Sequence, residues 1–386
     1  MAAQHINEWN SKLPQQGVNI FSKMSALAQK HQAINLAQGF PDFPVDPKLV
    51  DLVTSAMHHQ ANQYAPMPGL SLLRERIAEK YRSFYQINID PEKEITITNG
   101  ATQAIFTTIA TLIHPGDEVI IFEPAYDCYR PTVELFGGKV VEIALAAPHF
   151  AVDWQEVADC VTDRTRLIII NNPGNPSCTV WTKEDLLQLQ QIVVQHELFV
   201  LSDEVYEHLI YDEKQHQSAV LFEDLRAHSF VIASFGKLLH CTGWKLGYTI
   251  APVALTAEFR KVHQQNVFSV NTPMQHAIAA YLDDPNYYHE LSLFMQKKRD
   301  LVIAGLASSR FEMTPSSGTY FLLLNYKAIS DQPEMTFALE LIEKQGVALI
   351  PLAPFYQNAK EQQTLRLCFA KKEETLLRAI QILNAV

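Results

Sequence analysis

The stretch RLIIINNPGNP, residues 166–176, decides the fold class, and LFVLSDEVYE (198–207) and SFVIASFGK (229–237) repeat its plan. Each stretch opens with apolar, largely β-branched residues and then changes to polar residues, proline or glycine. Leu167 to Ile170 are apolar at every position rather than at alternate positions, which predicts a strand buried on both faces. We therefore expect parallel strands covered by helices on both sides.

The same alternation of short strands and helical patterns runs from residue 94 to residue 251. It predicts an α/β domain with a mainly parallel seven-stranded sheet, whose strands are EITIT (94–98), EVIIF (118–122), KVVEI (139–143), RLIII (166–170), LFVLS (198–202), SFVIAS (229–234) and GYTIA (247–251).

The rest of the chain predicts a smaller α+β domain and an N-terminal arm. Apolar spacing predicts helices near 21–30, 47–60, 70–85, 286–309, 334–345 and 372–385, with strands in TYFLLLNY (319–326), VALI (347–350) and TLRLCF (364–369). The segment INLAQGFPDFP (34–44) is expected to be a loop outside the core. We expect residues 1–45 to form the arm and part of the small domain, 46–279 the large domain and 280–386 the small domain.

Composition narrows the classes of function. The chain has 386 residues, 47% hydrophobic and 19% charged, and a formal net charge of −11. The negative charge argues against nucleic-acid and membrane partners. Five scattered cysteines without a CxxC pair suggest neither a disulfide framework nor a metal site, and the first residues do not resemble an export signal. We therefore expect a cytoplasmic protein.

Polar residues follow the predicted strands at the sheet edge where open α/β sheets bind ligands. Taken singly, each is common as a turn, a helix cap or a solvated charge. Five strand ends together deliver Asn99-Gly100-Ala101-Thr102, Glu123-Pro124-Ala125-Tyr126, Asn171-Asn172-Pro173-Gly174-Asn175-Pro176, Asp203-Glu204-Val205-Tyr206 and Ser234-Phe235-Gly236-Lys237. Their coincidence favours a shared site.

These groups suit a phosphorylated heteroaromatic cofactor. A helix that starts at Gly100 offers free N–H groups to a phosphate. Asp203 is suited to pair with a protonated ring nitrogen, and Asn175 and Tyr206 to hydrogen-bond a ring hydroxyl. Lys237 is suited to form a Schiff base. The set predicts pyridoxal 5'-phosphate.

The motifs NNPGNP, SDEVYE, SFGKLLHCTGWKLGY and LRLCF, in this order, resemble the class I aminotransferases of pyridoxal-phosphate fold type I over nearly the whole chain. LAQGFPDFP, QYAPMPG and EPAYDCY are similar to the branch of kynurenine, glutamine-phenylpyruvate and methionine aminotransferases. The resemblance implies ping-pong transfer of the α-amino group of methionine, or of an aromatic or neutral amino acid, to a 2-oxo acid.

The resemblance also implies roles for individual residues. Lys237 is expected to hold the cofactor covalently and to shuttle the substrate α-proton, while Tyr126 stacks on the ring. Phosphate ligands are expected at Gly100, Ala101, Thr102, Ser234 and Lys245. Tyr64 is expected to reach the phosphate in the neighbouring subunit of a homodimer.

For the substrate, Arg366 resembles the arginine that binds the α-carboxylate, helped by Gly39 and Asn175. No second arginine for a distal carboxylate is recognised, so the side-chain pocket is expected to be apolar. Phe21 is expected to line it, although an ordinary core position for Phe21 is equally compatible with the sequence.

Three residues depart from the family pattern. Lys245 stands where arginine is usual, which predicts weaker binding of the cofactor phosphate. Gly236 replaces a serine beside Lys237. Cys178 replaces a glycine after NNPGNP, which puts the backbone conformation of that loop in question.

Other functions remain open at this point. A β-lyase acting on cysteine conjugates shares the same site, and the ratio of pyruvate and ammonia to 2-oxo acid would distinguish it. A non-catalytic cofactor-binding regulator is disfavoured because the chain has no spare basic domain. A nicotinamide dehydrogenase is disfavoured because no GxGxxG follows the first strand of the sheet.

Overall fold

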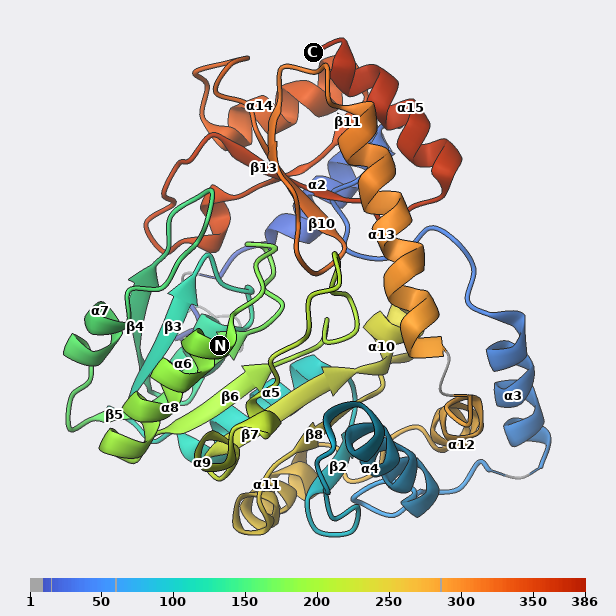
Figure 1. Ribbon diagram of the computed structural model, residues 1–386, viewed down its shortest axis with the longest axis vertical. Coiled ribbons are helices and arrows are strands. Elements are labelled where there is room, and N and C mark those ends of the chain that lie inside the picture. Colours follow the sequence, from blue (N-terminus) through green and yellow to red (C-terminus); the bar gives the residue numbers. More distant parts are fainter. Residues whose placement is uncertain (1–9, 15, 60, 285–286) are drawn as a thin grey trace, which may run out of the picture.

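Seven strands form the central sheet of the computed structural model, which describes residues 10–14, 16–59, 61–284 and 287–386 (Figure 1). The strand order is β2-β8-β7-β6-β5-β3-β4. Strands β7, β6, β5, β3 and β4 pair in parallel, whereas β8 is antiparallel to both of its neighbours. Their bounds are β2 (Ile95–Thr98), β3 (Glu118–Glu123), β4 (Lys139–Ala144), β5 (Thr165–Asn171), β6 (Phe199–Asp203), β7 (Ser229–Ser234) and β8 (Gly247–Ile250).

Helices cover both faces of this sheet, as the uninterrupted apolar runs predict. Leu167 to Ile170 are all buried. Leu167 and Ile169 pack with residues of α5, while Ile168 and Ile170 belong to the larger cluster on the opposite face. The helices of this part are α3 (Pro47–His58), α4 (Ser71–Tyr85), α5 (Ala101–Leu112), α6 (Tyr129–Leu135), α7 (Trp154–Asp159), α8 (Lys183–His196), α9 (Glu223–Arg226), α10 (Phe235–Leu238), α11 (Val253–Asn266) and α12 (Thr272–Tyr281).

A smaller α+β unit lies above the central sheet in Figure 1. Its four-stranded sheet has the order β12-β13-β10-β9, and all its pairs are antiparallel. The elements are β9 (Glu312–Thr314), β10 (Phe321–Asn325), β12 (Ile350–Pro351), β13 (Thr364–Cys368), α2 (Ile20–Lys30), α13 (Tyr287–Gly305), α14 (Glu334–Glu340) and α15 (Glu373–Asn384). The predicted fold class is confirmed.

The expectation that residues 34–44 form a loop outside the core is wrong for their first part. Strand β1 (Ile34–Asn35) pairs in parallel with β11 (Val347–Ala348). Leu36 and Ala37 are buried beside it. The physical reason is that β11 supplies a backbone partner from far along the chain, which local propensity does not reveal. Of the predicted arm, residues 1–9 and 15 lie outside the described residues.

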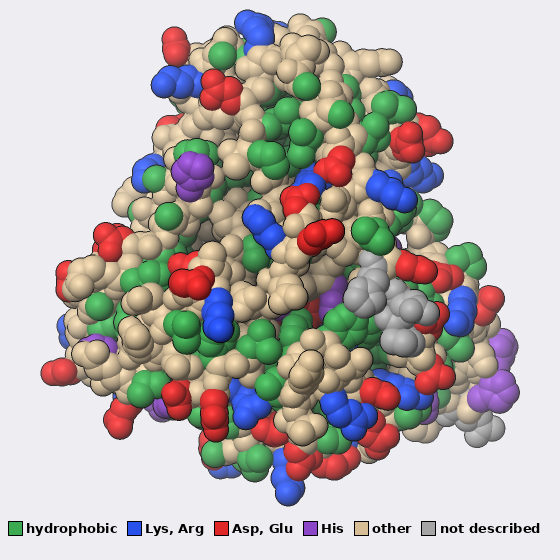
Figure 2. Space-filling view, in the orientation of Figure 1, with side chains coloured by type: hydrophobic (Ala, Val, Ile, Leu, Met, Phe, Trp, Pro, Cys, Tyr) green, Lys and Arg blue, Asp and Glu red, His purple; other side chains and the backbone are tan. Residues whose placement is uncertain are grey.

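Acidic and basic side chains are interspersed over the face of the molecule that Figure 2 shows. Within the described part of the chain, no helix combines the length and apolar character needed to cross a membrane.

Candidate active site

A cavity of ≈ 140 Å³ lies at the carboxyl ends of the central strands. Strand ends β5, β6 and β7 and the start of α5 all contribute to its wall. Ten residues predicted from the sequence line it, namely Gly100, Ala101, Thr102, Tyr126, Asn175, Asp203, Tyr206, Ser234, Lys237 and Lys245. The structure therefore brings the five strand-end motifs to one place.

Lys237 enters the cavity from α10, directly after β7. Its Nζ donates to Tyr320 Oη at 3.0 Å and to the Gly39 carbonyl at 3.4 Å. Burial lowers the pKa of this amine from 10.5 to about 8, against the opposing attraction of nearby Asp203. A much larger fraction of Lys237 is therefore neutral near pH 7 than of an exposed lysine.

Asp203 ends β6 and is 3% exposed. Tyr129 Oη donates to its Oδ2 at 2.6 Å, and the Val205 N–H donates to its Oδ1 at 3.3 Å. Burial raises the pKa of Asp203 to about 6, although the Tyr129 hydrogen bond and the charge of Lys237 act in the opposite direction. The carboxylate is thus costly to ionise here and would gain from a cationic partner.

The N-terminus of α5 forms a cradle for an anion. Gly100 precedes the helix with φ +75°, a conformation that favours glycine, and no side chain caps the first N–H groups. A Cβ atom at Gly100 would lie 3.3 Å from Lys245 Nζ, so the lysine amine lies directly beside this helix end. Together they provide a positive charge and free donors.

Arg366 lies outside the lining of this cavity but reaches it through Asn175. Its guanidinium is fully buried on β13, donating to Asn175 Oδ1 and, at 3.0 Å, to the Ala37 carbonyl. Its Nε has no hydrogen-bond partner, and within the described residues it forms no ion pair. The centroid of the Phe321 ring lies 3.8 Å from the Arg366 Cζ atom. This arrangement leaves donors of a buried cation available to a carboxylate.

The other predicted site residues lie at different distances from the cavity. Gly39 contributes the carbonyl beside Lys237. Phe21, on α2, has its ring 5.2 Å from Arg366 Cζ and 5.7 Å from the Phe355 ring. Tyr64 does not join the cavity of its own chain: it is 82% exposed and packs edge-on against Phe268.

Several residues that hold the site have no role assigned from the sequence. Tyr129 contacts Asp203, and Tyr320 contacts Lys237. At the end of the SDEVYE motif, Glu207 pairs with Lys80, with Nζ and Oε1 2.5 Å apart. The sequence signal that could have revealed this ion pair is the presence of two glutamates, Glu204 and Glu207, in a motif expected to be buried. Buried carboxylates need cationic or hydrogen-bonding partners.

Two departures from the family pattern fit the local packing. A Cβ atom at Gly236 would lie 3.0 Å from Thr242 Cα, so a serine would require the chain to shift. Cys178 has φ +61° and therefore adopts the left-handed conformation that a glycine would adopt there.

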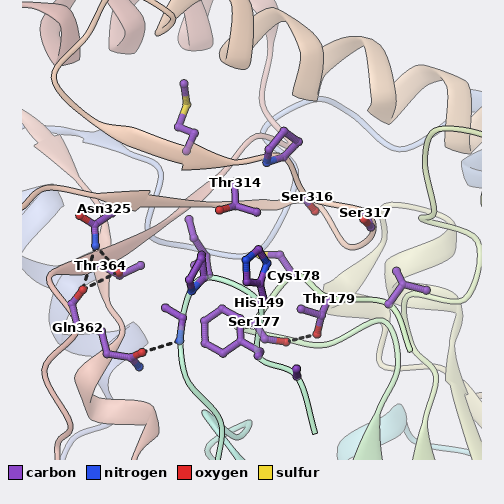
Figure 3. A pocket seen from close by; sticks show the side chains of 18 of the residues that line it. His149, Ser177, Cys178, Thr179, Thr314, Ser316, Ser317, Asn325, Gln362 and Thr364 are labelled. Atoms are coloured by element: carbon purple, nitrogen blue, oxygen red, sulfur yellow. Dashed lines mark hydrogen bonds between the residues drawn. The ribbon is translucent and has the colours of Figure 1, made fainter. Parts of the chain in front are cut away.

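The loop carrying Cys178 also borders a second, larger cavity of ≈ 850 Å³. In Figure 3, Ser177, Cys178 and Thr179 lie opposite Thr314, Asn325 and Thr364 of the small unit. We call this cavity the back groove. The loop of residues 174–180 therefore lines both cavities, with Asn175 in the first and Ser177 to Thr179 in the back groove.

Comparisons with known proteins agree with this geometry. A model of the family "Aminotransferase class I and II" matches residues 31–383. The chain is 49% identical over 375 residues to methionine aminotransferase of Escherichia coli strain K12, covering 97% of each chain. It is 30% identical over 385 residues to human kynurenine–oxoglutarate transaminase 1, covering 91% of each.

A solved structure of YbdL from Escherichia coli, for which a methionine aminotransferase function was identified, matches with a TM-score of 0.96 and 48% identity. The match covers 98% of this chain and 99% of that chain. The resemblance drawn from the motifs is confirmed, and the chain belongs to the class I and II aminotransferases.

Proposed function

We propose that this enzyme uses pyridoxal 5'-phosphate to move the α-amino group of methionine, or of another neutral or aromatic amino acid, onto a 2-oxo acid. The observation that carries the proposal is one cavity that joins the Lys237 amine and the Asp203 carboxylate and adjoins the buried cation Arg366. The name of the 49% identical relative supports methionine as the donor.

The residues of the cavity fit this cofactor. Asp203 would pair with the protonated ring nitrogen and so relieve the cost of its burial. The α5 N-terminus and Lys245 would hold the phosphate, with Ser234 nearby in the same wall. Asn175, whose Oδ1 accepts from Arg366, has Nδ2 donors to offer a ring hydroxyl together with Tyr206.

When bound, pyridoxal phosphate supplies an aldehyde carbon for the amino group and a ring that accepts the electron pair released at the substrate α-carbon. Lys237 then acts on the substrate: its neutral amine takes the α-proton and returns a proton at the end of the transfer. The pKa of about 8 keeps that amine near the balance between its two forms.

Arg366 binds the α-carboxylate and thereby fixes which C–H bond faces Lys237. Phe21 and Phe355 stand near the same guanidinium, with ring centroids 5.2 and 5.8 Å from Cζ. An apolar donor side chain, a thioether or an aromatic ring packs favourably against such rings.

The proposal extends to the organisation of the protein. Residues 46–279 form the large domain, 280–386 the small domain, and 1–45 the arm and part of the small domain. In a homodimer, the exposed Tyr64 reaches the partner's cofactor phosphate. We place the enzyme in the cytoplasm, with five unpaired cysteines as support.

The test is a panel of amino acids offered singly to the enzyme loaded with pyridoxal phosphate. Loss of the cofactor's visible absorbance in a single turnover reports donation, and added 2-oxo acid restores it. Methionine and aromatic amino acids should react fastest. Lys237→Ala should lose both the absorbance and the turnover, whereas Lys261→Ala, an exposed lysine on α11, should keep both.

Release of pyruvate and ammonia in place of 2-oxo acid exchange would contradict the proposed reaction. Persistent turnover in Lys237→Ala would contradict the assigned catalytic residue.

A further inference from the structure

Tyr320 is a fully buried tyrosine whose hydroxyl lies between the catalytic lysine and the backbone that borders the site. Its Oη donates to the Gly39 carbonyl at 2.5 Å and accepts from Lys237 Nζ at 3.0 Å. Because the single hydroxyl proton goes to Gly39, the oxygen presents its lone pairs to the lysine. The direction of both hydrogen bonds is therefore fixed.

The carbonyl that orients Tyr320 is itself held in place. The carbonyls of residues 37–40 all accept hydrogen bonds from residues of the small unit. Arg366 donates to Ala37, and Lys371 donates to Gln38 and Phe40, at 3.0, 3.3 and 2.7 Å. A Cβ at Gly39 would lie 2.8 Å from Phe321, so the segment is also tightly packed.

A neutral lysine amine has two N–H groups and one lone pair, and the cavity supplies acceptors for both N–H groups. Tyr320 Oη takes one and the Gly39 carbonyl, at 3.4 Å from Nζ, is placed to take the other. The lone pair that remains is the one that must receive the substrate α-proton.

We propose that Tyr320 is a positioning residue for Lys237, whose hydroxyl holds the lysine amine in the cavity with its lone pair free whenever the amine is not joined to the cofactor. This inference rests on the proposed function, because in a transamination the amine is released in the first half-reaction and stays free until the second half-reaction ends. Without the hydroxyl, a flexible side chain with four rotatable bonds has to be ordered again at each release.

Other groups near the amine act through charge rather than through a fixed hydrogen bond. The charged groups near Lys237 are Asp203 at the end of β6, Arg366 on β13, and Lys245. Cys368 on β13 is also near, but burial raises the pKa of its thiol, so it stays uncharged. The rings of Tyr206 and Tyr320 both have centroids 5.6 Å from Nζ. A change confined to the Tyr320 hydroxyl leaves all these charges in place.

The test compares Tyr320→Phe with Tyr326→Phe. Tyr326 is also fully buried, and its hydroxyl also donates to a backbone carbonyl, that of Gln332 at 2.7 Å, but it does not contact Lys237. We expect kcat of Tyr320→Phe to fall about tenfold while KM for methionine changes less than about threefold. Tyr326→Phe should keep both constants within about twofold of the wild type.

A second readout uses cofactor-free protein. The rate at which added pyridoxal phosphate is taken up, followed by its visible absorbance, should rise with pH through about 8 as Lys237 loses its proton. In Tyr320→Phe we expect this rate to be several-fold lower at pH 8, because the amine is no longer held. Tyr326→Phe should take up the cofactor at the wild-type rate.

The outcomes separate this inference from the proposed function. A wild-type enzyme that does not transaminate refutes the proposed function, whereas uptake by its cofactor-free form still tests Tyr320. An active wild type with an unchanged kcat in Tyr320→Phe overturns the inference. So does a rise in KM alone, which would mean that Tyr320 only supports the Gly39 segment.

Should Tyr320→Phe fail to fold, 3-fluorotyrosine at position 320 keeps the ring and hydroxyl but makes the oxygen a weaker acceptor. A lower kcat in that variant supports the inference, and a wild-type kcat overturns it.

Discussion

Arg366 is a buried cation whose charge is offset by an amide oxygen, a backbone carbonyl and aromatic faces rather than by a carboxylate. Such a site is suited to bind a carboxylate through charge-assisted hydrogen bonds, because the planar fork of arginine matches two carboxylate oxygens. The surroundings of Arg366 alone therefore indicate that the missing counter-charge is a carboxylate.

Replacing this residue should separate substrate binding from cofactor binding. Arg366→Ala should raise KM for the amino donor and lower kcat/KM about 100-fold, the cost of losing a bidentate charged pair. The visible absorbance of the bound cofactor should persist. Arg366→Lys keeps the charge without the fork and should recover only part of the loss. An unchanged kcat/KM in Arg366→Ala would show that the carboxylate binds elsewhere.

Asp203 predicts an unusual dependence of stability on pH in the cofactor-free protein. Its folded-state pKa of about 6 lies above the ordinary value of 3.8, so the folded chain binds this proton more tightly than the unfolded chain. The contribution to the free energy of unfolding therefore falls as pH rises from about 4 to about 6. Above pH 6 the full cost, about 3 kcal/mol, is present.

Asp203→Asn removes the titration. Without cofactor, this variant should be more stable than the wild type at pH 7.5 by up to about 3 kcal/mol, and the difference should roughly halve at pH 5. Urea unfolding at the two pH values measures it. With cofactor present, the wild type should be the more stable protein. A difference that grows as the pH falls would contradict the assigned shift.

Most residues of the candidate site are predictable because they follow strand ends in short motifs. Asp203 ends a buried run, Asn175 and Lys237 follow buried runs within four residues, and parallel strands bring such ends together. Tyr129 and Tyr320 were missed for a physical reason. Tyr129 is the first residue of α6, Tyr320 precedes β10, and only tertiary packing brings their hydroxyls to Asp203 and Lys237.

At the scale of elements, the turn after β6 is tied to α4 by a buried polar cluster. Lys80 of α4 donates to Glu207 Oε1 and to Tyr248 Oη, at 2.5 and 2.6 Å. Burial alone would raise the pKa of Glu207, but the charge and hydrogen bond of Lys80 hold it at about 2. Tyr206 is adjacent to Glu207, so this ion pair also holds a residue of the active-site wall.

Breaking the pair should be costly. Glu207→Gln leaves the Lys80 ammonium buried without its counter-charge, which should lower the free energy of unfolding by about 3–5 kcal/mol. Glu340→Gln removes a surface ion pair between the last residue of α14 and Lys344, and it should change the free energy of unfolding far less. Denaturant unfolding of the two variants measures the contrast, and equal effects would contradict the stabilising role of the buried pair.

Element existence was more predictable than element boundaries. The predicted helix over 334–345 is an α-helix only to Glu340 and continues as a π-helix over Leu341–Gln345. The run VALI is divided between β11 and β12, which belong to two different sheets. Local apolar spacing does not record such a change of partner.

At the scale of the whole molecule, Tyr64 and Phe268 form an exposed aromatic pair, 82% and 48% accessible in a single chain. Large apolar side chains gathered at the surface are typical of contact sites. This observation supports the proposed homodimer, in which Tyr64 completes the partner's site.

Subunit mixing tests that arrangement. Lys237→Ala and Tyr64→Ala should each be impaired alone, but refolding them together should produce mixed dimers with one intact site. Random pairing predicts recovery of up to about a quarter of the wild-type activity per chain. A mixture no more active than the sum of its parents would contradict a site shared between subunits.

The loop of residues 174–180 lines the back groove with Ser177 to Thr179 and the catalytic cavity with Asn175. Laboratory evolution that randomised only the residues lining the catalytic cavity would leave Ser177 to Thr179 unchanged, because they do not line it. Substitutions at these positions would shift the backbone that carries Asn175, whose Oδ1 accepts a hydrogen bond from Arg366. The preferred amino donor would then change although every residue that lines the catalytic cavity stays the same.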